Sequence, residues 1–469
     1  MLNNTEKTME KIVALCKNRG FIFAGSDIYG GLANTWDYGP LGARMKNNVK
    51  DTWRKRFIQE RRNSYEVDAD ILMHPKVWEA SGHIASFSDP LLDCKECKMR
   101  HRADTLIENF DPDAHPDKMT KEEMFEYIKA HSIPCPHCGK HNFTDIREFN
   151  LMFQTYRGVT NDAKSVIYLR PENAQGEYVN FLNVQKTGRM KLPFGIAQIG
   201  KAFRNEIVAR QFIFRMREFE QMEMQFFVRP GEEMKWWNQW KETRMAWHRA
   251  LGFGDDQYRF HDHEKLAHYA NAATDIEYNF PFGFKEVEGI HSRTDFDLGN
   301  HQKFSGKKMQ YFDPETGESY VPYVVETSIG VDRMVLQVLS AAYREEQLEN
   351  GESRVVLAFP PALAPVKVAV MPLVKKDGLP DVAQRIIDQL KYDFNVVYDE
   401  KDSIGKRYRR QDAVGTPFCV TVDHQTLEDG TVTVRHRDTM QQERVAIDDL
   451  YRMVDDEVSY RKLFRKLNL

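Results

Sequence analysis

The residues that most directly suggest chemistry surround one expected turn between two strands. Phe203-Arg204-Asn205-Glu206 ends a strand predicted over residues 195–206, and Phe219 opens the next strand. Further guanidinium groups gather at this turn, from Arg210, Arg215 and Arg217. Guanidinium forks match phosphate oxygens, and an aromatic ring at a strand start can stack on a base. The pattern favours a nucleotide site, and the alternative is a surface hairpin with solvated arginines.

The returning strand, residues 219–228, separates its side chains by type. Successive strand residues point to opposite faces. Polar groups and one aromatic ring share the first face, at Phe219, Gln221, Glu223 and Gln225. Apolar groups share the second face, at Met222, Met224 and Phe226. We expect the polar face to meet a ligand and the apolar face to meet the core.

Four of the six cysteines form two short knuckles, Cys94-x-x-Cys97 and Cys135-x-x-Cys138. Each knuckle can turn two thiolates toward one point, and two knuckles complete a tetrahedral zinc site with Zn–S distances of about 2.3 Å. The long, charged segment between the knuckles indicates an insertion with its own short helix. We predict zinc here. Four reduced thiols or the remnant of a lost site are the alternatives, because a disulfide is disfavoured in a reducing compartment.

Regular elements are expected to position these groups. After Gly39-Pro40, apolar residues recur at every fourth position of an expected helix, at Met45, Val49, Trp53 and Phe57. A strand is expected over residues 65–73, ending at Pro75, which cannot donate to a strand ladder. A helix over residues 233–250 carries four tryptophans, which we expect to pack in the core.

Beyond a cluster of prolines at Pro360, Pro361 and Pro365, the chain changes character. Proline clustering predicts a boundary between domains, and strands then alternate with helices over residues 366–422, which indicates a small α/β domain. Within it, one run combines basic side chains with an aromatic ring, at Lys406, Arg407, Tyr408, Arg409 and Arg410. This combination suits contacts with RNA phosphates and bases, although such a run alone also fits a solvated helix face.

Length and composition set the frame. A chain of 469 residues is about three times a typical domain, so two or three domains are expected. With 41% hydrophobic and 29% charged residues, disorder across the whole chain is excluded. Prolines interrupt the most apolar stretch, and the first residues lack a secretory pattern, so we expect a soluble cytoplasmic protein with no membrane contact. A net charge of −4 means that RNA would have to meet local basic patches.

Three segments, in order, resemble the motifs of class II aminoacyl-tRNA synthetases. They are the helix and strand closing at Pro75, the Phe203-Arg204-x-Glu206 turn with Arg215-x-x-x-Phe219, and Gly330-Val331-Asp332-Arg333. Further strings are similar to the dimeric glycyl-tRNA synthetases, namely Trp36-Asp37-Tyr38-Gly39-Pro40-Leu41-Gly42, His74-Pro75-Lys76-Val77-Trp78-Glu79-Ala80-Ser81-Gly82-His83, Arg170-Pro171-Glu172-Asn173-Ala174-Gln175-Gly176 and Glu326-Thr327-Ser328-Ile329-Gly330. Asp332 replaces the glutamate of most class II enzymes, as the glycyl family does.

The resemblance covers essentially the whole chain and implies an α+β fold. Residues 1–360 would form the catalytic domain, an antiparallel sheet flanked by helices, with a zinc-knuckle-like insertion at about 89–150 and a helical insertion at about 231–280. Residues 361–469 would form an α/β anticodon-binding domain. A homodimer through the apolar segment 41–75 is implied as well. A chain cut near Phe359 would then still form the adenylate and charge tRNA poorly.

The resemblance also implies roles in binding ATP. Arg204 and Arg333, the catalytic pair, would hold the α- and γ-phosphates, Glu206 would meet the adenine amino group and Phe219 would stack under the ring. Mg²⁺ would bridge phosphate oxygens, with Glu286 as its candidate protein ligand. The remaining implied ATP contacts are Asn205, Phe214, Arg215, Met216, Arg217, Glu218, Val287, Gly330, Val331 and Asp332.

Glycine offers only an ammonium and a carboxylate, so its selection must come from excluding larger side chains. By resemblance, three acids and a serine would line a pocket with no volume for a methyl group, namely Glu172, Glu223, Glu326 and Ser328. The other implied glycine contacts are Arg102, Phe219, Glu220, Gln221, Met222, Arg293, Thr327, Ile329 and Gly330.

The implied activity is ATP-dependent formation of glycyl-adenylate, followed by transfer of glycine to the 3′ end of tRNA(Gly). The carboxylate of glycine attacks the α-phosphorus in line, so positioning and charge neutralisation supply the rate and no catalytic base is needed. One alternative is a class II synthetase for another small amino acid or proline. Another is a non-catalytic accessory subunit of a nucleic-acid enzyme, against which the intact Arg204, Glu206, Phe219 and Arg333 argue.

Overall fold

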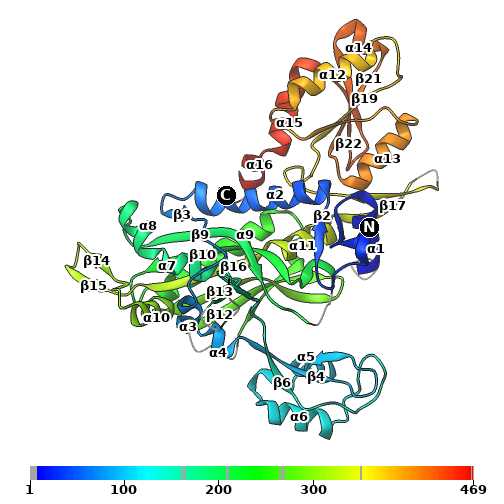
Figure 1. The fold of residues 1–469 in the computed structure, drawn as a ribbon. Helices are drawn as coiled ribbons and strands as arrows, with labels where there is room; N and C mark the ends of the chain where they lie inside the picture. Colours follow the sequence, from blue (N-terminus) through cyan, green and yellow to red (C-terminus); the bar gives the residue numbers. More distant parts are fainter. Residues whose placement is uncertain are drawn as a thin grey trace.

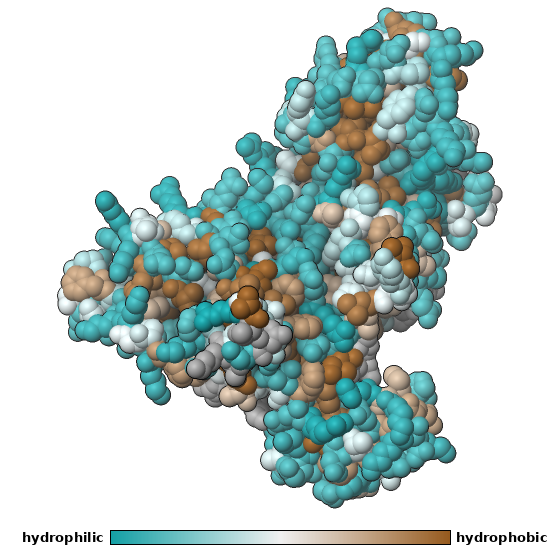
Figure 2. Space-filling model, in the orientation of Figure 1, coloured by the Kyte–Doolittle hydropathy of each residue, from teal (hydrophilic) through white to brown (hydrophobic). Residues whose placement is uncertain are grey.

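The computed structural model describes residues 8–159, 162, 165–207, 211–263, 266, 270–348, 351–465 and 467. A central body carries a small lobe, drawn in cyan, and a C-terminal lobe, drawn in orange and red (Figure 1). Hydrophilic residues cover much of the visible face of both lobes (Figure 2). Arg210 lies outside the described residues. Among the helices of the described ranges, none is long and apolar enough to cross a membrane.

The body is organised around a seven-stranded sheet of order β11-β12-β13-β16-β10-β9-β3. All neighbouring strands are antiparallel except β3 and β9, which confirms the expected antiparallel sheet. The strands are β3 (Ser64–Glu66), β9 (Phe194–Phe203), β10 (Glu218–Val228), β11 (Tyr258–Asp262), β12 (Ala272–Phe280), β13 (Gly283–Thr294) and β16 (Tyr323–Gly330). The strand expected over residues 65–73 is thus confined to β3.

The expected helical insertion at 231–280 is wrong in its second half. Helix α9 (Glu233–Ala250) forms as predicted, but β11 and β12 follow it and extend the main sheet. The sequence signal was present, because Ile276, Tyr278 and Phe280 alternate with polar residues and all three are buried in the core.

Helices cover both faces of the sheet. One face meets α1 (Met9–Arg19), α2 (Pro40–Arg54) with its continuation η3 (Lys55–Gln59), α9 and α11 (Val331–Ala342), which together enclose the main core. The tryptophans of α9 pack there as predicted. The other face is covered at one end by α7 (Ala174–Val179), α8 (Phe181–Thr187) and α10 (Phe296–Ser305) around a smaller core, and α3 (Lys76–Ala80) packs against α10. Beyond that cover, toward Glu218 and Gly330, this second face opens into a cavity.

The small lobe contains a three-stranded sheet and two helices with their own apolar cluster. Its elements are β4 (Ser88–Asp93), β5 (Arg100–Arg102), β6 (Arg147–Asn150), α5 (Ala103–Phe110) and α6 (Lys121–Ala130). Shorter elements of the body are β1 (Ile22–Ala24), β2 (Trp36–Tyr38), α4 (His83–Ser86), β7 (Gln154–Tyr156), β8 (Val166–Tyr168), β14 (Tyr311–Asp313), β15 (Glu318–Tyr320), β17 (Tyr343–Gln347) and β18 (Ser353–Leu357).

The C-terminal lobe is the expected α/β unit, with a five-stranded sheet of order β20-β19-β21-β22-β23 around a separate core. Its strands are β19 (Val368–Pro372), β20 (Val396–Tyr398), β21 (Phe418–Val422), β22 (Thr431–His436) and β23 (Gln442–Ala446). Its helices are α12 (Leu379–Leu390), α13 (Ile404–Val414), α14 (His424–Asp429) and α15 (Leu450–Val458).

The last helix, α16 (Tyr460–Arg465), leaves this lobe and lies beside α2 of the body (Figure 1). Phe464 joins the main core. The C-terminal lobe is also joined to the body near the prolines. There Arg437 donates to the carbonyl oxygen of Phe359 at 2.7 Å, and Arg354 pairs with Asp412 at 2.9 Å. The C-terminal segment therefore contributes to the body as well as to its own lobe.

Candidate active site

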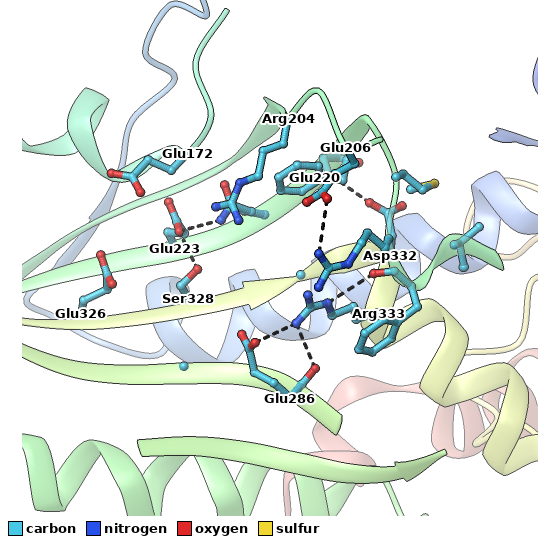
Figure 3. Close-up of a pocket in the computed structure, with 18 of the residues that line it drawn as sticks. Glu172, Arg204, Glu206, Glu220, Glu223, Glu286, Glu326, Ser328, Asp332 and Arg333 are labelled. Carbon is cyan, nitrogen blue, oxygen red and sulfur yellow. Dashed lines mark hydrogen bonds and ion pairs between the residues drawn. The ribbon is translucent and has the colours of Figure 1, made fainter. Parts of the chain in front are cut away.

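A cavity of about 240 Å³ opens on the sheet face that the helices leave uncovered (Figure 3). Glu172, Glu223 and Glu326 lie at one end of the picture and Arg333 lies toward the other, with Arg204 between them. The lining consists of Glu172, Arg204, Glu206, Ile213, Phe214, Arg215, Met216, Phe219, Glu220, Gln221, Glu223, Glu286, Gly289, His291, Arg293, Glu326, Ser328, Gly330, Asp332 and Arg333.

Strand alternation on β10 and β16 determines which of the predicted residues line the cavity. Cross-strand pairs place Glu223 beside Ser328 and Gln221 beside Gly330, all in the cavity lining. The polar face predicted for residues 219–228 therefore does face the cavity. On the opposite face, Met222 and Ile329 point into the main core and Thr327 points toward α9, which removes these three predicted glycine contacts from the lining.

The guanidinium groups and rings occupy one end of the cavity. Arg204 Nε donates to the carbonyl oxygen of Pro171 at 3.1 Å, and its guanidinium lies 5.3 Å from the ring centroid of Phe219. Glu206 accepts a hydrogen bond from Arg215 at 3.3 Å. These contacts hold two cations and one aromatic ring around the expected turn.

Arg333 lies across the cavity from this turn. Its guanidinium is 4.4 Å from the ring centroid of Phe214 and 3.0 Å from a carboxylate oxygen of Glu286. Burial alone would raise the pKa of Glu286, but the charge of Arg333 lowers it below its ordinary value. Glu286 is therefore a carboxylate held by an arginine in this structure.

Asp332 and Glu220 meet α2. Asp332 accepts hydrogen bonds from Tyr38 Oη at 2.6 Å and Lys46 Nζ at 2.9 Å, and Glu220 pairs with Lys46 at 2.8 Å and Lys50 at 3.1 Å. Although both residues border the cavity, their carboxylates tie β10 and the start of α11 to α2. The Glu220 carboxylate is thus engaged by α2.

Three carboxyl groups define the other end. Glu223 accepts hydrogen bonds from Ser328 Oγ at 2.5 Å and from the backbone N–H of Asn173 at 2.9 Å. Burial, and then the charges of Glu326 and Glu172, raise the pKa of Glu223 to about 8. Burial also opposes ionisation of the other two acids, but Arg293 lowers the pKa of Glu326 and His83 lowers that of Glu172. Of the three acids, Glu223 is therefore the one that most readily takes up a proton.

A second set of side chains fixes these acids. Arg293 donates to Asp297 at 2.8 Å and to Glu326 at 3.3 Å, while His291 Nδ1 lies 3.1 Å from Glu326. Burial alone would lower the pKa of His291, but the bond with Glu326 raises it. Sequence reasoning missed His291, together with the lining residues Ile213 and Gly289. Strand parity from Arg293 could have found both His291 and Gly289.

Several predicted residues lie outside this lining. Arg102 pairs with Asp104 and with Asp89 at 3.0 Å, in the small lobe. The backbone N–H of Asn205 donates to the carbonyl oxygen of Leu151 at 2.8 Å. The others are buried in the core or turned toward neighbouring loops and strands, namely Val287, Val331, Arg217 and Glu218. Their side chains support the cavity rather than line it.

Comparison with known proteins agrees with this geometry. The family described as "tRNA synthetase class II core domain (G, H, P, S and T)" matches residues 156–342, and "Anticodon binding domain" matches residues 367–457. The glycine--tRNA ligase of Caldanaerobacter subterraneus subsp. tengcongensis is 58% identical over 97% of this chain and 99% of the relative. The chain belongs to the glycine–tRNA ligase family. Family members from Clostridium kluyveri and Geobacillus thermodenitrificans are each 55% identical, over 97% of this chain and 99% and 98% of their own lengths.

The basic run that the sequence predicts to contact tRNA, residues 406–410 of α13, is only partly accessible. Arg407 is 3% exposed and donates to the carbonyl oxygens of Pro372 at 2.7 Å and Leu373 at 3.2 Å. Its predicted contact with tRNA is therefore replaced by a role inside the lobe, because a buried guanidinium cannot reach a phosphate. Tyr408 hydrogen-bonds Thr421, and Arg409 and Arg410 form ion pairs. Lys406 stays exposed.

The four knuckle cysteines come together in the small lobe. Their sulfur atoms all lie within 4.8 Å of one another, with Cys94 Sγ 3.6 Å from Cys138 Sγ and Cys97 Sγ 3.7 Å from Cys135 Sγ. Both knuckles turn in the same way, since backbone N–H groups four residues on donate to the carbonyl oxygens of Cys94 and Cys135. Four thiol ligands around one point fit a tetrahedral zinc site.

Proposed function

We propose that this chain activates glycine with ATP to form glycyl-adenylate and then transfers glycine to tRNA(Gly), with release of AMP. The observation that carries the proposal is the division of one cavity into an arginine-rich end and a three-carboxyl end. Phosphates suit the first end and a small ammonium suits the second. The carboxylate of glycine would then point at the α-phosphate between them.

At the arginine-rich end, Arg204 would hold the α-phosphate and Phe219 would stack on adenine. Glu206 would accept from the adenine amino group. Arg333 would exchange its present partner, Glu286, for the γ-phosphate, and this exchange would release the Glu286 carboxylate toward a magnesium ion. When bound, that ion would neutralise phosphate charge. The protein's own contribution is to align the reactants and to stabilise charge at phosphorus.

At the three-carboxyl end, the substrate ammonium would meet Glu223, Glu172 and Glu326. Their bulk, braced by Arg293 and Ser328, would leave no room for a methyl group, so glycine would be selected by exclusion. A direct test of the proposed function is charging of tRNA(Gly) with labelled glycine by the purified chain, with AMP measured as the product. Failure to charge with ATP and glycine present would overturn it.

We also propose that the anticodon-binding lobe contacts tRNA through accessible groups such as Lys406 rather than through Arg407. Because charged tRNA supplies the ribosome, we propose the cytoplasm as its compartment.

The small lobe is proposed to hold zinc through Cys94, Cys97, Cys135 and Cys138. We expect about one zinc ion per chain in protein purified without chelators, and replacement by Co²⁺ should give intense thiolate-to-cobalt absorption. Cys138→Ser should reduce the metal content and lower hydrogen-exchange protection in β4 and β5, while Cys419→Ser, at a buried cysteine of the C-terminal lobe, should retain the metal. A metal-free protein with full protection of this lobe would contradict the assignment.

A homodimer remains a proposal, but the surface expected for it changes. The apolar face of α2 packs into its own chain, since Met45, Val49 and Trp53 are all 0–1% exposed. Among the exposed apolar residues of the described ranges, two neighbours lie between β1 and β2, where Ile28 is 88% and Tyr29 is 87% exposed. Such side chains are typical of an interface when they are grouped on a surface.

We therefore expect sedimentation at twice the chain mass of 54.9 kDa. The double variant Ile28→Asp/Tyr29→Asp should shift the protein toward the monomer, because it places charges in an apolar contact. Leu427→Asp, at an exposed apolar residue of the C-terminal lobe, is the matched control. A wild-type monomer that is fully active would refute the dimer.

A further inference from the structure

A buried charged cluster lies on the sheet face opposite the cavity. Arg244 and His248 of α9 converge on Glu288 of β13, and all three side chains are 0% exposed. Arg244 Nε is 3.2 Å from one carboxylate oxygen of Glu288, and His248 Nε2 is 2.8 Å from the other. Burying such charges is costly, and a well-packed apolar replacement is often as stable. Stability alone is therefore a weak reason for this cluster.

Arg244 also reaches the neighbouring strand. It donates a hydrogen bond to Thr327 Oγ1 of β16, and its guanidinium lies 3.6 Å from the ring centroid of Phe57, which fixes it from the other side. Thr327 lies between Glu326 and Ser328, which both line the three-carboxyl end of the cavity. One side chain thus ties together two strands that form the wall of the glycine site.

Glu288 sits at an irregularity of β13. Ile276 of β12 pairs with Glu288, but the next residue, Glu277, pairs with Glu286, so Val287 is an extra residue. This bulge resets the alternation: Glu286 and Gly289 both face the cavity, while Glu288 faces α9. β-Bulges beside active sites commonly re-aim side chains in this way. Arg244 and His248 bind the carboxylate of Glu288, which directly follows the extra residue, and thereby hold the bulge in register.

We propose that Arg244 is a positioning residue for glycine selection, acting through Thr327 and Glu288 on the strands that carry Glu326, Ser328 and Gly289. The proposal rests on the proposed glycine activation. Excluding a single methyl group requires walls placed within about half an ångström, so a small release of either strand admits a larger amino acid. Arg204, at the nucleotide end, is held by separate contacts with Pro171 and Phe219. The glycine end should therefore respond more than the ATP end.

The test uses ATP–pyrophosphate exchange by the full-length protein. In Thr327→Val, the side-chain shape is kept and the acceptor for Arg244 is lost. In Arg244→Met/Glu288→Leu, the guanidinium and the carboxylate are removed together, so neither is left without the other, although His248 loses its partner. For each variant we expect the KM for glycine to rise about tenfold and the preference for glycine over alanine to fall about tenfold, while the KM for ATP stays within about twofold.

Tyr258→Phe is the matched control, because it removes a buried hydroxyl that accepts from Gln337 at 2.5 Å in the same core. It should lower thermal stability without changing the KM for glycine. If the double variant fails to fold, Thr327→Val decides. A folded variant with wild-type KM for glycine and wild-type selectivity would overturn the positioning role. Absence of glycine-dependent exchange in the wild type would instead reject the proposed function.

Discussion

Arg204→Ala is expected to lower the rate of glycine-dependent pyrophosphate exchange by about two to three orders of magnitude, because a preorganised donor to transition-state charge is typically worth about 3 to 4 kcal/mol. Arg204 is held in place before any substrate binds, by the carbonyl oxygen of Pro171 and the ring of Phe219. Little reorganisation is then needed when charge develops on the α-phosphate. The fold should be retained, since the guanidinium lies at the cavity rather than in the core.

Lys201→Ala is the matched control for Arg204→Ala. Lys201 also lies on β9, but its ammonium is half exposed and pairs with Glu218 outside the main cavity. Its removal should change exchange by less than about twofold, because exposed ion pairs contribute little. A folded Arg204→Ala protein with near wild-type exchange would show that the phosphate is held elsewhere.

Glu223→Gln is expected to separate stability from function. The folded carboxyl has a pKa of about 8, against 4.5 for an exposed glutamate, so the native state binds more protons than the unfolded state between these pH values. Wild-type stability should therefore fall as the pH rises from about 4.5 to 8, relative to the glutamine variant, and the difference should stay constant above that range. Thermal unfolding of both proteins without glycine measures this effect.

Glu223→Gln should also bind glycine more weakly. A charge-assisted bond to the ammonium is typically worth about 2 to 3 kcal/mol, so the KM for glycine should rise about 30-fold to 150-fold. In the wild type, that KM should fall as the pH rises toward 8 and Glu223 ionises. Glu177→Gln is the control, since Glu177 is a buried acid of raised pKa that lies outside the cavity lining. An unchanged KM in Glu223→Gln would remove Glu223 from the ammonium site.

The sequence predicted the sheet face of the site well, because strand periodicity is a local property. Phe219, Gln221 and Glu223 line the cavity as their alternation with Met222 and Met224 required. The bulge at Val287 could not be foreseen, because an extra residue in a strand leaves no periodic signal. The predicted tRNA contact of Arg407 was wrong for a related reason. A basic residue is expected to be exposed unless the carbonyl oxygens that accept its hydrogen bonds are known, and these lie far from Arg407 in the sequence.

Contacts between segments that lie far apart in the sequence were the second feature that the sequence did not predict. Nothing in the local pattern of α16 indicates that Phe464 enters the core of the distant body. The expectation that a chain cut near Phe359 stays folded must therefore be revised. Such a cut removes α16 and the partners of Arg354 and Phe359, so its loss of activity could reflect damage to the body. Substitution of exposed residues such as Lys406 in the full-length chain is the cleaner way to separate tRNA recognition from activation.

The central claim is that one cavity selects glycine by exclusion and activates it with ATP. The most direct measurement is ATP–pyrophosphate exchange by the wild-type protein with glycine, alanine, serine and proline compared under identical conditions. The account predicts that kcat/KM for glycine exceeds that for alanine by at least about a hundredfold, as a rigid wall that rejects a methyl group requires. Equal or faster exchange with alanine or proline would contradict it.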